Sequence, residues 1–179
     1  MRIDIYTDGA CKGNPGDGGY SFSIAIYDNA MLLFKKIVSV GVPNTTNNRM
    51  ELSAVIDGLN TLYDCPPFAE ISLKNESDPM YRNIVEINIY SDSQYVCKAI
   101  NLKWLDKWVV DNFKKIKNPD LWSQMFSIIN ELKTNRNDLN FIWVKGHGGN
   151  EGNEQVDKLA SSACGKSGII IEDTIIVKQ

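Results

Sequence analysis

The chain has 179 residues, 43% of them hydrophobic and 23% charged, which are ordinary values for one globular domain with its own core. Its formal net charge is −3, so the chain-wide positive charge common in nucleic-acid-binding proteins is absent. No apolar run approaches the ~18 residues of a membrane span, and the N-terminus lacks a signal peptide's apolar core. We therefore expect a cytoplasmic protein with no membrane partner.

The first third of the chain has the pattern of three consecutive strands. Residues 2–7 alternate and lead into Asp8, 11–19 (CKGNPGDGG) have turn composition, and 20–28 and 31–42 are two further strand-like runs. The short connections predict an antiparallel meander. The glycine-rich segment lacks the GK[ST] ending of a nucleotide-binding loop and joins two strands, so it does not indicate a nucleotide site.

From Thr46 the apolar period changes to that of a helix. Apolar residues between Met50 and Leu62 fall near the i, i+3, i+4, i+7 spacing, and the group 46–48 before them offers N-cap oxygens. Residues 64–83 are polar, contain proline and show no clear period, so we expect a loop insertion there.

The second half alternates between strands and helices. We predict a strand at 85–92, helices over most of 93–134 with a break at 117–119, a strand at 138–147 and a helix at 153–163. The tail, 165–179, is apolar and β-branched, which suits an edge segment, and nothing in it indicates chemistry. This order predicts one α/β domain at 1–164, a mixed five-stranded sheet flanked by helices.

The cysteines and the single histidine argue against a zinc site. The 4 cysteines form no CxxC pair, and the one histidine, His147, lies between glycines. We expect reduced thiols, and we do not expect His147 to be a packed core residue. Trp122 and Trp143 are expected to be core residues.

Lysines gather in the segment 98–117. A solvated helix face is the usual meaning of such a run. Interleaved Trp104, Trp108 and Phe113 favour contact with nucleic acid, because aromatic rings beside cations suit sugars and bases. The lysines are Lys98, Lys103, Lys107, Lys114, Lys115 and Lys117.

Four carboxylates lie where they could ligate divalent metal ions. Mg²⁺ prefers near-octahedral oxygen coordination from separate elements. Asp8 and Asp92 end predicted strands, Glu51 lies about one turn into the first helix, and Asp157 lies in the last helix. An Asp at a strand end is usually a cap or turn residue, and spacing alone does not show that the four converge.

At these residues the sequence resembles ribonuclease H of type 1, the bacterial-type enzyme. The resemblance spans roughly residues 2–164 and implies the fold of that family, with three antiparallel strands followed by two parallel ones. Five ordered motifs carry it: TDGACKGNPGDGGYSF (7–22), TTNNRMELSAVIDGL (45–59), IYSDSQYVCKAI (89–100), NPDLW (118–122) and WVKGHGGNEGNEQVDKLA (143–160).

The resemblance also implies roles for individual residues. Asp8, Glu51, Asp92 and Asp157 match the family's catalytic metal ligands, and His147 matches a loop histidine that helps with proton transfer or product release; an exposed histidine without function is the alternative. The implied substrate contacts fall into four groups. They are Asn14 and Thr46 on a DNA-strand phosphate, Asn47, Asn48 and Gln94 in the minor groove, Asn118 on the RNA strand, and Trp104 on deoxyribose with Lys114 and Lys115 in the basic protrusion.

These roles imply an endonuclease that hydrolyses the RNA strand of RNA–DNA hybrids, leaving 5′-phosphate and 3′-hydroxyl ends. Two Mg²⁺ ions ~3.5–4 Å apart, or Mn²⁺ in their place, would serve as cofactors, and we expect a monomer without an organic cofactor. Two alternatives stay open: a DNA strand-transfer or junction-resolving nuclease of the same superfamily, and a non-catalytic hybrid-binding module.

Overall fold

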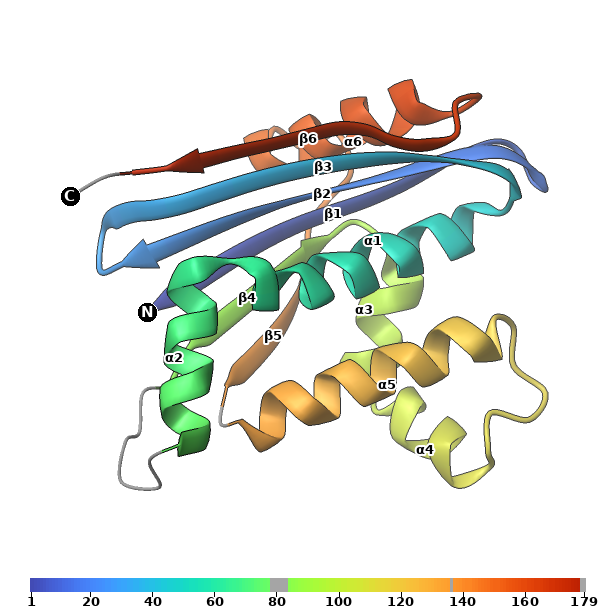
Figure 1. Cartoon of the computed structure of the whole chain (residues 1–179). Coiled ribbons are helices and arrows are strands. Elements are labelled where there is room, and N and C mark those ends of the chain that lie inside the picture. The colour runs from blue at the N-terminus through green and yellow to red at the C-terminus, as the bar shows by residue number, and fades with distance from the viewer. Residues whose placement is uncertain (78–83, 136, 178–179) are drawn as a thin grey trace.

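A computed structural model describes residues 1–77, 84–135 and 137–177 of the chain (Figure 1). Its centre is one mixed sheet with the strand order β5-β4-β1-β2-β3-β6. The strands are β1 (Arg2–Gly13), β2 (Gly16–Asp28), β3 (Met31–Thr45), β4 (Glu86–Ser91), β5 (Asp138–Trp143) and β6 (Gly168–Ile176). β1, β2, β3 and β6 pair antiparallel, whereas β4 and β5 extend the sheet from β1 in parallel.

Helices cover both faces of the sheet. α1 packs on β1 and β2 and contacts α5, while α6 packs on β1, β2 and β3; Figure 1 shows α6 on one face and α1, α3, α4 and α5 on the other. The helices are α1 (Asn47–Thr61), α2 (Pro66–Ser77), α3 (Gln94–Asn101), α4 (Trp104–Val110), α5 (Pro119–Thr134) and α6 (Glu151–Ala163), with a short 3₁₀ helix η1 (Leu62–Asp64). The helix face that α1 turns to the sheet contains the predicted apolar residues, among them buried Met50 and Leu59, and the last of them, buried Leu62, begins η1.

The predicted mixed sheet flanked by helices is confirmed, with one strand more than the five predicted. The sixth strand is the tail: β6 pairs antiparallel with β3, from Gly41↔Gly168 to Phe34↔Ile176. Its side chains are mostly exposed, so its sequence has no pattern of alternating buried residues. Its β-branched composition was the only sequence signal for a strand there.

Two local predictions were wrong. The glycine-rich segment 11–19 is largely strand, because β1 and β2 stay paired as far as Gly13↔Gly16 and leave only Asn14 and Pro15 as the turn. The described part of 64–83 contains η1 and α2 instead of a loop, and residues 78–83 lie outside the described residues. Phe68 of α2 is buried and meets Tyr63 edge-on, which anchors the helix that proline and polar residues concealed.

No helix in the described ranges combines the length and the hydropathy needed to cross a membrane.

Candidate metal and nucleic-acid site

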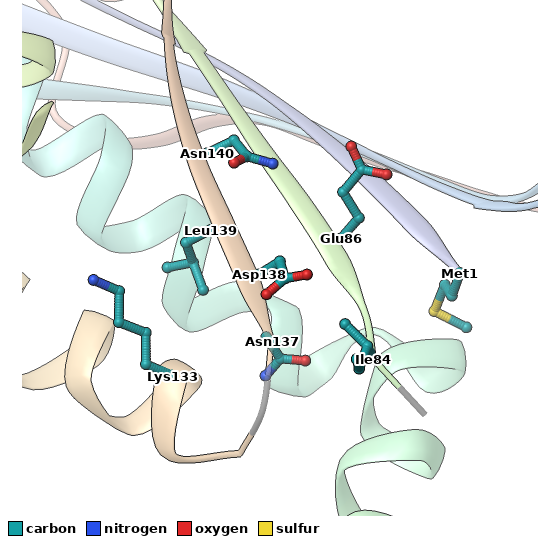
Figure 2. Close-up of a pocket in the computed structure, with 8 residues that line it drawn as sticks. All are labelled: Met1, Ile84, Glu86, Lys133, Asn137, Asp138, Leu139 and Asn140. Carbon is teal, nitrogen blue, oxygen red and sulfur yellow. The ribbon is translucent and has the colours of Figure 1, made fainter. Parts of the chain in front are cut away.

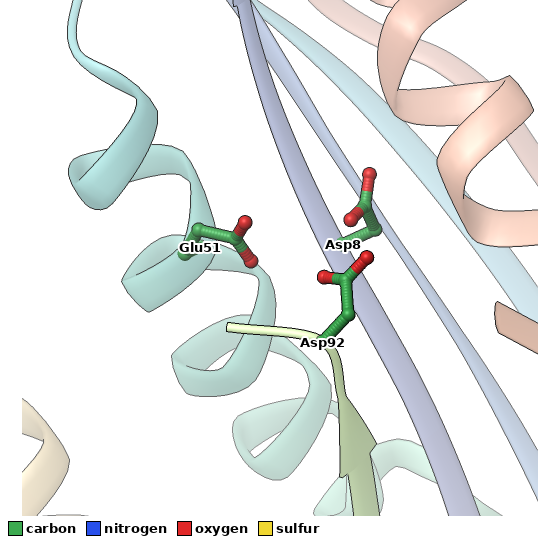
Figure 3. Close-up of side chains that lie close together, drawn as sticks. All are labelled: Asp8, Glu51 and Asp92. Carbon is green, nitrogen blue, oxygen red and sulfur yellow. The ribbon is translucent and has the colours of Figure 1, made fainter. Parts of the chain in front are cut away.

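Two of the predicted carboxylates are brought together by strand register. In the parallel ladder between β1 and β4 the last partners are Thr7 and Ser91. Asp8 and Asp92 are the next residues along the two strands, so both carboxylates lie at the same end of this ladder (Figure 3). Asp8 was predicted to end its strand; instead β1 continues to Gly13 against β2, and only the pairing with β4 ends before Asp8.

Glu51 reaches the same point from α1. The helix passes so close to β1 that a Cβ on Gly9 would lie 2.3 Å from the Glu51 backbone nitrogen, so only glycine permits this approach. As a result, carboxylate oxygens of Asp8, Glu51 and Asp92 all lie within 4.8 Å of one another. Figure 3 shows the three side chains pointing into one space between α1 and the sheet edge.

Two of the three carboxylates are buried, and the three repel one another when ionised. Asp8 is 5% exposed and Glu51 is 6% exposed. Burial, followed by the charges of Asp92 and Asp157, raises the pKa of Asp8 to about 8. Burial, followed by the charges of Asp8 and Asp92, also raises the pKa of Glu51 well above its usual value. A cation bound between these carboxylates would stabilise their ionised forms and lower their pKa values.

A divalent cation fits these residues. The Glu51 Oε2 atom is buried and has no hydrogen-bond partner among the described residues, an arrangement that leaves an acceptor free for a ligand. The donors are all carboxylate oxygens, which hard cations such as Mg²⁺ and Mn²⁺ prefer over the nitrogen and sulfur ligands of zinc.

Asp157 lies beside this group but outside the 4.8 Å set. It is on α6, on the opposite face of the sheet from α1, and its charge contributes to the raised pKa of Asp8. Its Oδ2 atom is 3.5 Å from Nδ1 of His147. The fourth predicted ligand is therefore an electrostatic neighbour of Asp8, and its carboxylate lies next to the ring of His147.

His147 lies in the turn between β5 and α6. Its side chain is 83% exposed, and its backbone has a positive φ of 51°. The prediction that it is not a core histidine is confirmed. An exposed imidazole that touches a carboxylate can exchange protons with water and with a bound substrate.

The predicted contacts near α1 form a connected group. Asn14, in the β1–β2 turn, accepts a hydrogen bond at its Oδ1 from the backbone N–H of Asn47 at 3.3 Å. The Asn47 side chain favours the charged form of the Glu51 carboxylate and offsets part of the rise in pKa that burial causes. Thr46 is the N-cap residue of α1 but makes no side-chain cap hydrogen bond, contrary to the capping prediction, so its hydroxyl is not engaged there. Asn48 is exposed beside it.

Gln94 and Asn118 lie at the starts of α3 and α5. Gln94 is exposed and accepts a hydrogen bond at Oε1 from Lys98 Nζ at 2.8 Å. Asn118 is the N-cap residue of α5 with φ 56° and accepts at 3.4 Å from Nη1 of Arg49. Arg49 also pairs with both Asp120 oxygens, at 3.0 and 2.6 Å. The motif NNRMEL contained Arg49, but only the fold shows that it joins α1 to α5.

The predicted basic protrusion is the region of α4 and the segment after it. Trp104 is half-buried at the start of α4, with its ring 6.3 Å from that of Trp108. Lys114 and Lys115 are exposed. These residues lie apart from the carboxylate group, so a ligand that contacted both would have to be extended.

Two residues near Asp92 were not predicted. Trp143 was expected in the core, yet it is 47% exposed, and its Nε1 donates to the Asp92 backbone oxygen at 3.0 Å. Asn153 of α6 donates from Nδ2 to Asp92 Oδ2 at 3.4 Å. Trp122 is fully buried, as predicted. The sequence alone does not distinguish a tryptophan that packs into the core from one that lies at the surface.

The described chain also has a hollow away from these residues (Figure 2). It measures about 1050 Å³ and is lined by residues at the start of β4 and β5, including Glu86, Asp138 and Asn140. Because β4 and β5 are parallel, this is the end of the strands opposite to Asp92. The hollow is therefore separate from the carboxylate group.

Comparison with known proteins identifies relatives over nearly the whole chain. The family model described as RNase H matches residues 1–165. Ribonuclease H of Lachnoclostridium phytofermentans is 37% identical over 182 residues, covering 98% of this chain and 99% of that protein. Ribonuclease H of Syntrophus aciditrophicus is 36% identical over 171 residues, covering 93% of this chain and 82% of that protein.

Solved structures agree on the fold. LC9-RNase H1, a type 1 RNase H with the type 2 active-site motif, superposes with a TM-score of 0.70 at 23% identity, covering 94% of this chain and 76% of that one. LC11-RNase H1 in complex with an RNA/DNA hybrid superposes with a TM-score of 0.53 at 26% identity, covering 90% and 96%.

Proposed function

This chain belongs to the ribonuclease H family, and we propose that it hydrolyses the RNA strand of RNA–DNA hybrids with divalent ions held by Asp8, Glu51, Asp92 and Asp157. Membership makes it a nuclease and a hydrolase. The observation that carries the proposed site is the convergence of the Asp8, Glu51 and Asp92 oxygens within 4.8 Å. The solved relative that holds an RNA/DNA hybrid supports the choice of substrate.

The carboxylates would hold two Mg²⁺ ions, or Mn²⁺, at the sheet edge. Bound divalent ions neutralise charge on the scissile phosphate and make water a stronger nucleophile. The free Oε2 of Glu51 and the raised pKa of Asp8 support this role, since both groups gain a partner when a cation enters. Asp157, more exposed and next to His147, supplies further negative charge at the side of Asp8.

His147 would handle protons. Its ring is exposed at the site, and the Asp157 carboxylate 3.5 Å from Nδ1 can orient it. A ring held in this way can give a proton to the leaving 3′-oxygen or take one from water. The products would carry 5′-phosphate and 3′-hydroxyl ends.

The hybrid would be read by the polar groups on both sides of the carboxylates. Asn47, one turn before Glu51 on α1, and Asn48 and Gln94 would offer amides to the minor groove, where 2′-hydroxyls distinguish RNA from DNA. Asn14 and Thr46 would hold a DNA-strand phosphate, and Asn118 a neighbouring RNA nucleotide. Trp104 would pack on a deoxyribose, with Lys114 and Lys115 supplying positive charge to the backbone.

A panel of labelled duplexes tests this function. RNA–DNA, DNA–DNA and RNA–RNA duplexes are incubated with the full chain, with Mg²⁺ and with a chelator. We expect cleavage of the RNA strand of the hybrid alone, abolished by the chelator. Preference for DNA–DNA would favour the strand-transfer or junction-resolving alternative, and binding without cleavage would favour the hybrid-binding module.

Asp92→Asn tests the site. It should abolish cleavage and leave hybrid binding intact, whereas Asp173→Asn, on the distant strand β6, should cleave normally. Full turnover by Asp92→Asn would refute the assignment of these carboxylates.

A further inference from the structure

Asp92 differs from the other three carboxylates in lying outside regular structure. Asp8 lies within β1, Glu51 within α1 and Asp157 within α6, whereas Asp92 follows the last residue of β4 and precedes α3. Neither a strand ladder nor a helix therefore fixes its backbone. A carboxylate that must meet two others within a few ångströms needs another constraint.

Trp143 supplies that constraint to the backbone of Asp92. Trp143 ends β5, in register with Ser91 of β4. Just beyond this pair, the Val144 backbone N–H donates to Ser91 O at 3.0 Å, and the Trp143 indole N–H donates to Asp92 O at 3.0 Å. The indole thus adds a hydrogen bond beyond the end of the ladder and holds the Asp92 peptide where the strand has ended.

Asn153 acts on the carboxylate itself. Its Nδ2 donates to Asp92 Oδ2 at 3.4 Å, and its side chain is fixed, since the residue is only 1% exposed. The Asn150 side chain accepts from the Asn153 backbone N–H at 3.1 Å, which anchors this turn of α6. Asn153 Oδ1 is buried without a hydrogen-bond partner among the described residues. An unpaired buried amide oxygen lowers stability, so packing alone does not account for an asparagine here.

The loop between β5 and α6 packs against the Asp92 carboxylate at Gly146. A Cβ on Gly146 would lie 2.7 Å from Asp92 Oδ2, so the loop backbone passes directly beside the carboxylate. Asp92 is therefore bounded by Trp143 at its carbonyl, Asn153 at Oδ2 and the Gly146 backbone along its side.

We propose that Trp143 and Asn153 are positioning residues for Asp92, Trp143 through its backbone carbonyl and Asn153 through its carboxylate, so that the oxygens of Asp92 meet those of Asp8 and Glu51 before a cation binds. This rests on the proposed function. Outer partners that orient a metal ligand typically contribute about 10- to 100-fold in affinity or activity.

Trp143→Phe is the first test, because it removes the N–H donor and keeps an aromatic, although smaller, ring. We expect kcat on a labelled hybrid to fall about tenfold and the Mg²⁺ affinity, measured by calorimetry on the protein alone, to fall by a similar factor. KM for the hybrid and the Tm in chelator should stay at wild-type values, since the ring is half-exposed. The matched control is Leu102→Ala. Leu102 is exposed and lines, together with Trp143, a hollow of about 380 Å³, and its replacement should leave all four quantities unchanged.

Asn153→Leu is the second test, because leucine has a similar shape and no polar atoms. Positioning predicts a lower Mg²⁺ affinity and kcat together with an unchanged or higher Tm in chelator, since the unpaired Oδ1 is removed. A purely structural asparagine would instead lower the Tm in parallel with activity, and that result would overturn its assignment.

Two results would overturn the role of Trp143. One is wild-type kcat and Mg²⁺ affinity in Trp143→Phe, and the other is a loss confined to KM, which would place the indole against the substrate. Asp92→Asn, assayed alongside, separates this failure from failure of the proposed function: an inactive Asp92→Asn with a normal Trp143→Phe refutes only the positioning role.

Discussion

Thr7 of β1 and Ser91 of β4 are the last partners of a parallel ladder, and the residue after each is an aspartate. A shift of this register by one residue would turn one of the two carboxylates to the other face of the sheet, because side chains alternate along a strand. The ladder therefore determines whether Asp8 and Asp92 can share a cation. α1 then brings Glu51 over Gly9 to complete the group.

Replacing Asp8 should stabilise the metal-free protein at neutral pH. The folded-state pKa of Asp8 is raised from 3.8 to about 8, so folding opposes its ionisation. The loss of stability caused by ionising Asp8 in the folded state is absent below about pH 4. It grows as the pH rises towards 8 and is complete above that. Asp8→Asn should raise the unfolding free energy in chelator on the order of 2 kcal/mol at pH 8 and by little at pH 4. Urea unfolding at both pH values measures it, and an equal effect at pH 4 would contradict the electrostatic origin.

His147→Ala should slow cleavage without weakening the fold. Loss of a proton-transfer group typically lowers kcat about 10²-fold or more. Because the side chain is 83% exposed, the Tm should not change. Lys145→Ala, in the same loop, is the control and should keep its kcat. Steady-state kinetics on a labelled hybrid measure the effect, and a normal kcat in His147→Ala would make His147 an exposed loop residue without function.

Arg49→Ala should disturb substrate binding through α5. Arg49 pairs with both oxygens of Asp120 and also contacts Asn118, so its loss frees the start of α5. We expect KM to rise about threefold with kcat nearly unchanged, and the unfolding free energy to fall by about 0.5 kcal/mol, the scale of a surface pair. In a double-mutant cycle, Asp120→Ala should add little to Arg49→Ala. Fully additive effects would show that the two residues act independently.

Replacing Lys114 and Lys115 together by alanine should weaken hybrid binding and flatten its salt dependence. If each lysine contacts one phosphate, the slope of log affinity against log salt should fall in magnitude by about 2. The Mg²⁺ requirement for cleavage should not change, because these lysines lie after α4, away from the carboxylate group. An unchanged slope would mean that both lysines face away from the hybrid.

Where the sequence pattern was periodic, the elements it predicted are present. The alternation of 2–7 and the helical spacing after Thr46 correspond to β1 and α1, because one face of each is buried more deeply than the other and leaves a repeating apolar pattern. Where burial is slight or irregular, the pattern failed. β6 exposes most of its side chains, and α2 begins with two prolines, so neither shows a regular apolar face.

Trp143 and Asp157 show a second limit. Trp143 was expected in the core, yet its indole reaches the backbone oxygen of Asp92, just past the end of β4, which no local pattern encodes. Asp157 was grouped with the other carboxylates by motif, and the fold places it next to His147 and outside the tight group of three.

The sequence by itself determined the family resemblance, the α/β order and the identity of the carboxylates, because these depend on residue types and their succession along the chain. Only the tertiary structure decided that Asp8, Glu51 and Asp92 meet, that Asp157 lies to one side, and that Trp143 and Asn153 hold Asp92. Those facts depend on strand register and on how closely helices approach the sheet, which are set by contacts between residues far apart in sequence.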